Sequence, residues 1–162
     1  MADLVITRTY DASRERVWEM WTHAEEMQKW WGPKDFPRPT CKLDVQVGGT
    51  IHICMKTPDG QEIWSGGAYK EIVPNERLVM SDYFADKDGN KVSPTVYGMP
   101  HDFPLEMTIT VTLEDTKDPA SEFSPIKTKM TLRQGPHPAG EIFSMARAGW
   151  SESFEKLAEL LK

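Results

Sequence analysis

The sequence contains few of the features that mark secreted, metal-binding or membrane proteins. Its 162 residues include only two cysteines, Cys41 and Cys54, which cannot build a disulfide framework and do not show metal-ligand spacing. No apolar run approaches the roughly 20 residues of a membrane-spanning helix, and the first residues lack the basic start and apolar centre of a signal peptide. We therefore expect a cytoplasmic protein without a membrane span and without a metal site.

Basic residues are also outnumbered by acidic ones. The chain carries 19 Lys and Arg against 25 Asp and Glu, and its formal net charge is −6. Nucleic-acid binding requires a concentrated basic surface, whereas the basic residues here are scattered among acidic ones, and the densest group is Arg14-Glu15-Arg16. We therefore expect no nucleic acid among the partners.

The familiar catalytic motifs are absent as well. The sequence has no Gly-x-Ser-x-Gly nucleophile elbow, no glycine-rich phosphate loop, no His-Glu-x-x-His and no Cys-x-x-Cys. Nothing in the residues therefore points to a cofactor, and we expect a protein that binds rather than catalyses, with an enzyme kept as an alternative.

What the sequence does have is a cluster of tryptophans near its start. Such large apolar side chains favour a packing hub over a ligand-binding surface. Strand-like alternation over 6–10 precedes the cluster, and the capping box Thr22-x-x-Glu25 predicts that a second short helix begins where a first one ends. Four of the six tryptophans lie in this stretch: Trp18, Trp21, Trp30 and Trp31.

The remainder of the chain is predicted to form strands followed by one long helix. Apolar and polar residues alternate over 105–114 and 126–132, on either side of a polar loop at 115–125, as in an antiparallel sheet with one buried face. Apolar steps of three and four residues over 142–161 predict a C-terminal helix, with Gly149 in its apolar stripe. We predict an α+β fold in a single domain, residues 1–162. It consists of a curved antiparallel sheet of six to seven strands around that helix, with two short helices after the first strand.

Seven short motifs follow one another in an order that resembles a known family. They are Ala12–Trp18, Trp30-Trp31-Gly32-Pro33, Val47-Gly48-Gly49, Pro58-Asp59-Gly60, Gly67-x-Tyr69-x-Glu71-Ile72, Glu76-Arg77-Leu78 and Gly149-Trp150. Together they are similar to the bacterial homologues of the Hsp90 ATPase activator C-terminal domain, in the START-like (SRPBCC) superfamily. The resemblance implies a helix-grip fold with a cavity between the sheet and the C-terminal helix. It also implies relatives that include lipid carriers, hormone receptors and polyketide cyclases.

The expected pocket beneath a curved sheet predicts a binding protein for a small apolar molecule. For most of the side chains on its wall, plain core packing is the competing interpretation. Trp64, Tyr69, Asp82 and Trp150 are expected to border an opening, because each brings a polar group to an apolar wall. The residues predicted to bind the ligand are Trp64, Tyr69, Met80, Asp82, Met107, Met145, Gly149 and Trp150.

Two other functions stay open. His101 lies in a long segment with several prolines, of the kind that forms lids. An imidazole near a carboxylate can act as a base, so His101 and Asp82 are the candidates for a cyclase- or hydrolase-type enzyme; a solvent-exposed histidine is the competing interpretation. The family resemblance alone suggests a co-chaperone-like interaction domain. A homodimer through an exposed sheet edge is a further expectation.

Overall fold

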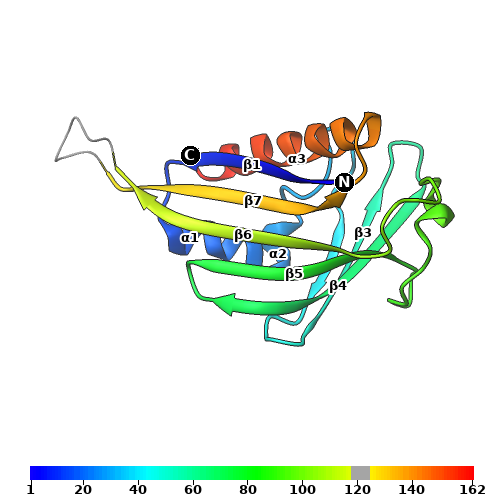
Figure 1. Cartoon of the computed structure of the whole chain (residues 1–162). Coiled ribbons are helices and arrows are strands. Elements are labelled where there is room, and N and C mark those ends of the chain that lie inside the picture. Colours follow the sequence, from blue (N-terminus) through cyan, green and yellow to red (C-terminus); the bar gives the residue numbers. More distant parts are fainter. Residues whose placement is uncertain (118–124) are drawn as a thin grey trace.

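The computed structural model of the chain describes residues 1–117 and 125–162, so most of the polar loop predicted at 115–125 lies outside the described residues. Seven strands form one curved antiparallel sheet in the order β1-β7-β6-β5-β4-β3-β2 (Figure 1). The strands are β1 (Ala2–Tyr10), β2 (Thr40–Leu43), β3 (Thr50–Lys56), β4 (Glu62–Val73), β5 (Arg77–Ala85), β6 (Met107–Thr116) and β7 (Lys127–His137).

The helices lie on one face of the sheet, behind it in the view of Figure 1. They are α1 (Arg14–Thr22), α2 (Ala24–Met27) and α3 (Glu141–Leu160), and a short 3₁₀ helix, η1 (Pro94–Tyr97), lies in the connection between β5 and β6. The predicted architecture is thereby confirmed: a curved seven-stranded antiparallel sheet, a long C-terminal helix and two short helices after the first strand. None of the helices in the described residues is long and apolar enough to cross a membrane.

Local sequence explains where the first two helices begin, with one correction. α1 starts after Ser13, whose Oγ accepts a hydrogen bond from the Arg16 amide at 3.2 Å, as an N-cap serine should. The capping box predicted at Thr22 is wrong. Thr22 Oγ1 donates instead to the Trp18 carbonyl at 2.8 Å, and α2 begins after His23 without a side-chain cap.

The core fills the space between the sheet and the helices. In β6, alternate residues from Met107 to Leu113 are buried, which confirms the predicted alternation, although the strand begins at Met107 and Leu105 is exposed. Trp21 and Trp30 are fully buried, with ring centroids 4.8 Å apart in edge-to-face contact, so the predicted packing hub is present.

β7 continues further than its sequence predicts. The sequence predicts alternation only over 126–132, and Pro136 beyond it donates no backbone hydrogen bond. The pairing of β1 with β7 shifts at this point: Ala2 pairs with His137 and Leu4 with Gln134, so two residues of β7 face the single residue Asp3. A bulge of this kind accommodates Pro136 and carries the strand on to His137.

Candidate functional site

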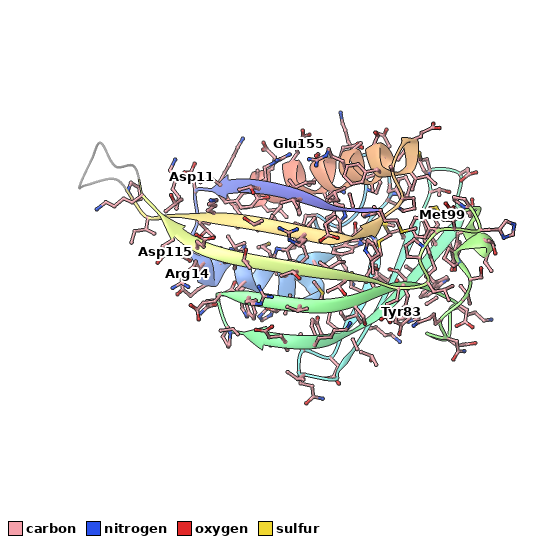
Figure 2. All side chains as sticks on the ribbon, in the orientation of Figure 1. Asp11, Arg14, Tyr83, Met99, Asp115 and Glu155 are labelled. Carbon is pink, nitrogen blue, oxygen red and sulfur yellow. The ribbon has the colours of Figure 1, made fainter. Side chains whose placement is uncertain are left out.

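A cavity of about 570 Å³ lies between the sheet, α3 and two loops. Its wall is built mainly from aromatic, aliphatic and methionine side chains of strands β3 to β7 and of α3. Tyr83 and Met99, which both line it, lie at one end of the molecule, and Arg14 and Asp115 lie at the opposite end (Figure 2). The cavity therefore lies toward the end of the sheet that is opposite Arg14 and Asp115.

One face of α3 forms a wall of the cavity. Ile142, Met145, Ala146, Gly149 and Trp150 recur at helical spacing and all line it. Met145 is 64% exposed, which places it at the rim. A Cβ at Gly149 would meet only Pro33 Cγ at 3.9 Å, an ordinary contact. The glycine therefore keeps space open rather than allowing a close approach.

The tryptophan-rich segment, residues 18–31, contributes a second wall, so the predicted packing hub also borders the cavity. Trp31 lines the cavity and packs edge-to-face on Trp150 with a centroid distance of 5.0 Å. The following Gly32 donates its amide to Ser153 Oγ at 3.0 Å, and Ser153 Oγ lies 3.0 Å from the Gly32 carbonyl. These hydrogen bonds hold the loop on α3.

The connection between β5 and β6 covers a third side. Ser93 caps η1 through its Oγ, and Gly98 ends it in a left-handed conformation at φ 82°. The Tyr97 hydroxyl donates to the Ala85 carbonyl at 2.6 Å and accepts from the Trp64 amide at 3.3 Å. The ring of Phe84 packs against that of Tyr97, at 5.3 Å between centroids. We call residues 86–106 the cover loop.

Four polar side chains form a hydrogen-bonded chain in the cavity wall. Trp150 Nε1 and His137 Nε2 both lie 2.8 Å from Gln134 Oε1, and Gln134 Nε2 lies 2.7 Å from Asp82 Oδ2. An indole N–H can only donate, so the Gln134 oxygen must face Trp150 and the amide nitrogen must face Asp82. Because the Gln134 oxygen can only accept, His137 must also donate to it, through Nε2. All donors in this chain point toward the carboxylate.

Burial sets the ionisation of the two titratable members. Removal from water raises the pKa of Asp82 to about 6, an effect that the hydrogen bond from Gln134 partly offsets. The same cause lowers the pKa of His137, against the opposing charge of Asp3. Around neutral pH the site therefore holds a carboxylate beside a neutral imidazole, and no described residue forms an ion pair with this carboxylate.

The structure separates the eight residues predicted to bind a ligand into two groups. Asp82, Met107, Met145, Gly149 and Trp150 line the cavity. Tyr69, Met80 and Trp64 do not.

Tyr69 and Met80 are paired core residues of β4 and β5, 1% and 4% exposed. They line a separate space of about 20 Å³, which shares Asp82 with the main cavity. Trp64 lies on the other face of β4, because its neighbours Ile63 and Ser65 line the cavity; it stacks on His52 at 4.7 Å between ring centroids.

His101 does not lie in the site. It is exposed and is not part of the cavity wall, so it does not meet Asp82 there. Within residues 1–117 and 125–162, no group of three or more His, Cys, Asp or Glu side chains could hold a metal ion.

Many members of the wall were not among the residues predicted from the sequence, and Trp31, Gln134 and His137 are the ones on which its aromatic and polar character depends. The alternation of Met130 and Leu132 would have placed Gln134 on the same face, had the strand been extended past position 132. Nothing in the sequence signals that His137 is 3% exposed between two prolines.

Comparison with known proteins identifies the family of this architecture. Residues 11–162 match the family described as Activator of Hsp90 ATPase homolog 1-like protein. No curated protein matches the sequence.

Solved bacterial structures resemble the chain over almost its full length. A protein from Chromobacterium violaceum is 25% identical, with a TM-score of 0.73 over 98% of this chain and 96% of that one. A protein from Nitrosomonas europaea is 23% identical, with a TM-score of 0.73 and coverages of 99% and 94%. The AHSA1 protein from Silicibacter pomeroyi is 18% identical, with a TM-score of 0.72 and coverages of 99% and 97%. All three proteins therefore share the fold of this chain.

Proposed function

We propose that this chain, which belongs to the family of Activator of Hsp90 ATPase homolog 1-like proteins, binds a small, largely apolar molecule in the cavity between its sheet and α3. The observation that carries the proposal is the cavity itself. Its volume of about 570 Å³ lies within the range of small-molecule sites, and its wall combines many apolar side chains with a few polar ones.

The composition of the wall supports a ligand rather than a packing defect. Close-packed interiors leave few voids larger than a water molecule, whereas this space has room for a ring system. Four methionines contribute to it, Met55, Met99, Met107 and Met145, and methionine adapts its shape to irregular contents. Met145 lies at the rim, so apolar side chains contribute to the wall from the interior to the surface.

Binding of a neutral hydrophobic dye tests the proposal. N-phenyl-1-naphthylamine should show saturable fluorescence enhancement with the purified protein. Gly149→Phe should abolish the enhancement, because the new ring occupies the cavity. Ala148→Phe is the matched control, since it adds the same ring at the neighbouring, exposed position of α3. Equal dye binding by both variants would contradict the proposal.

The two alternative functions have less support. An enzyme that uses His101 and Asp82 would need both in one site, and only Asp82 lines the cavity. A co-chaperone role draws on the family description alone. Stimulation of a cognate Hsp90 ATPase by this chain would be the measurement in its favour.

A further inference from the structure

We propose that the ligand carries a hydrogen-bond donor, best supplied as a protonated amine, which binds to Asp82 in the cavity. This inference rests on the proposed function and names the chemical class of its ligand. It predicts an apolar molecule with a cationic or N–H end, and it predicts that molecules ending in a carboxylate are rejected.

The direction of the hydrogen-bonded chain is the first argument. Trp150 and His137 donate to the Gln134 oxygen, which leaves the Gln134 nitrogen to donate to Asp82 Oδ2. The second carboxylate oxygen, Oδ1, has no hydrogen-bond partner among the described residues. Asp82 is half-buried and lines the cavity, so this free oxygen offers the ligand an acceptor. A ligand donor can therefore bind to Oδ1, whereas a ligand carboxylate placed there would face the charge of Asp82.

The charge of the wall is the second argument. Of the described residues that line the cavity, none is Lys or Arg. The ion pairs in the described part of the chain do not include Asp82. A carboxylate in a poorly hydrated site is stabilised most by a cation that forms a charge-assisted hydrogen bond with it. The protein does not supply that cation, and an ammonium group on the ligand would.

The position of Asp82 is the third argument. Asp82 pairs with Met107 across to β6, and it also lines the inner space beneath the cavity. Ser65 lines both spaces too, and its hydroxyl has no hydrogen bond recorded within the described residues, so it offers a second polar contact beside the carboxylate. An amphiphilic ligand would therefore place its polar end inward at Asp82 and its apolar body toward Met99 and Met145.

Three probes that share one ring system test the inference: 2-(aminomethyl)naphthalene, 2-methylnaphthalene and 2-naphthoate. Their dissociation constants are measured with the wild-type protein at neutral pH. We expect the amine to bind about tenfold more tightly than the hydrocarbon, as one charge-assisted hydrogen bond would give, and the carboxylate to bind more weakly than either. Equal affinity of amine and hydrocarbon, or tightest binding of the carboxylate, would overturn the inference without touching the proposed function.

Asp82→Asn then assigns the effect to the residue. Its shape is nearly unchanged, and it removes an uncompensated charge, so the fold is retained. The variant should lose the preference for the amine and keep the affinity for 2-methylnaphthalene. Asp102→Asn is the matched control, because it removes the same charge from an exposed position in the cover loop outside the cavity. An amine preference that survives in Asp82→Asn contradicts the inference, and failure of all three probes to bind the wild-type protein contradicts the proposed function itself.

Discussion

Gln134 donates its side-chain amide to Asp82 over 2.7 Å and so joins β7 to β5 across the intervening strand β6. The two residues lie 52 positions apart in the sequence. The glutamine is 8% exposed and uses both ends of its amide, since its oxygen also accepts from Trp150 and His137. It is the residue on which the polar side of the cavity depends.

Replacement of Gln134 by leucine is expected to lower the free energy of unfolding by about 1–3 kcal/mol. The change leaves two donors and one carboxylate without their partner in a buried position. Urea unfolding of both proteins measures the loss. Gln46→Leu is the control, because Gln46 also donates to an aspartate, Asp44, at 2.9 Å but is exposed; its effect should stay within about 0.5 kcal/mol. Equal effects would show that the buried chain adds nothing to stability.

Asp82 should make the protein more stable as the pH falls through about 6. The raised pKa means that the folded protein binds a proton at Asp82 near pH 6, whereas the unfolded chain does so only near 3.8. Between these values the native state holds more protons, so stability rises as the pH falls and is lower above pH 6, where both states are ionised.

His137 has the opposite effect, because its lowered pKa lets the unfolded chain bind the proton first. The comparison of wild type with Asp82→Asn, by urea unfolding at several pH values, isolates the carboxylate. The wild type should gain stability relative to the variant on acidification. A difference in unfolding free energy that stays constant with pH would mean that folding does not raise the pKa of Asp82.

Gly149→Ala is expected to stabilise the protein by up to about 1 kcal/mol, which is the gain in helix propensity. The added methyl group contacts only Pro33 Cγ, at 3.9 Å. Thermal unfolding measures the gain. The contrast is Gly98→Ala, at φ 82°, where an alanine is strained although the space is open. A loss of stability in Gly149→Ala would show that the added methyl group clashes with a neighbouring side chain of the cavity wall.

Tyr97→Phe should loosen the cover loop. The change removes the hydroxyl that donates to the Ala85 carbonyl and accepts from the Trp64 amide, at an expected cost of about 1 kcal/mol. Limited proteolysis within residues 86–106 should become faster. Tyr83→Phe is the control, since the Tyr83 hydroxyl has no hydrogen bond recorded in the described residues and lines the same cavity. Equal cleavage rates would rule out a pinning role for the Tyr97 hydroxyl.

Ser153→Ala should release from α3 the loop that contains Trp31 and Gly32. It leaves the buried Gly32 amide without its acceptor, and the expected loss is about 1–3 kcal/mol. The tryptophan emission of the protein, to which Trp31 next to Gly32 contributes, should change with it. Ser144→Ala alters an exposed serine of the same helix and should leave both stability and emission unchanged. An unchanged spectrum in Ser153→Ala would show that Trp31 is held by ring packing alone.

Local patterns predicted the sheet better than the site. Alternation identified β6 and most of β7, and helical spacing identified α3, because both periods depend only on residues that are close in the sequence. The same patterns placed Met107, Met145 and Gly149 on the correct faces. They misplaced Trp64 by one residue, which in a strand exchanges the two faces of the sheet.

The sequence by itself determined the fold, its family resemblance and the apolar character of its interior, since each follows from the order and spacing of side chains along the chain. Only the tertiary structure decided which polar groups meet. The polar chain of the cavity joins side chains from β5, β7 and α3: Asp82, Gln134, His137 and Trp150. They meet because only one strand, β6, lies between β5 and β7, and because α3 packs across the same face. Hydrogen bonds of this kind depend on strand order and on one bulge at Pro136, which no local pattern encodes.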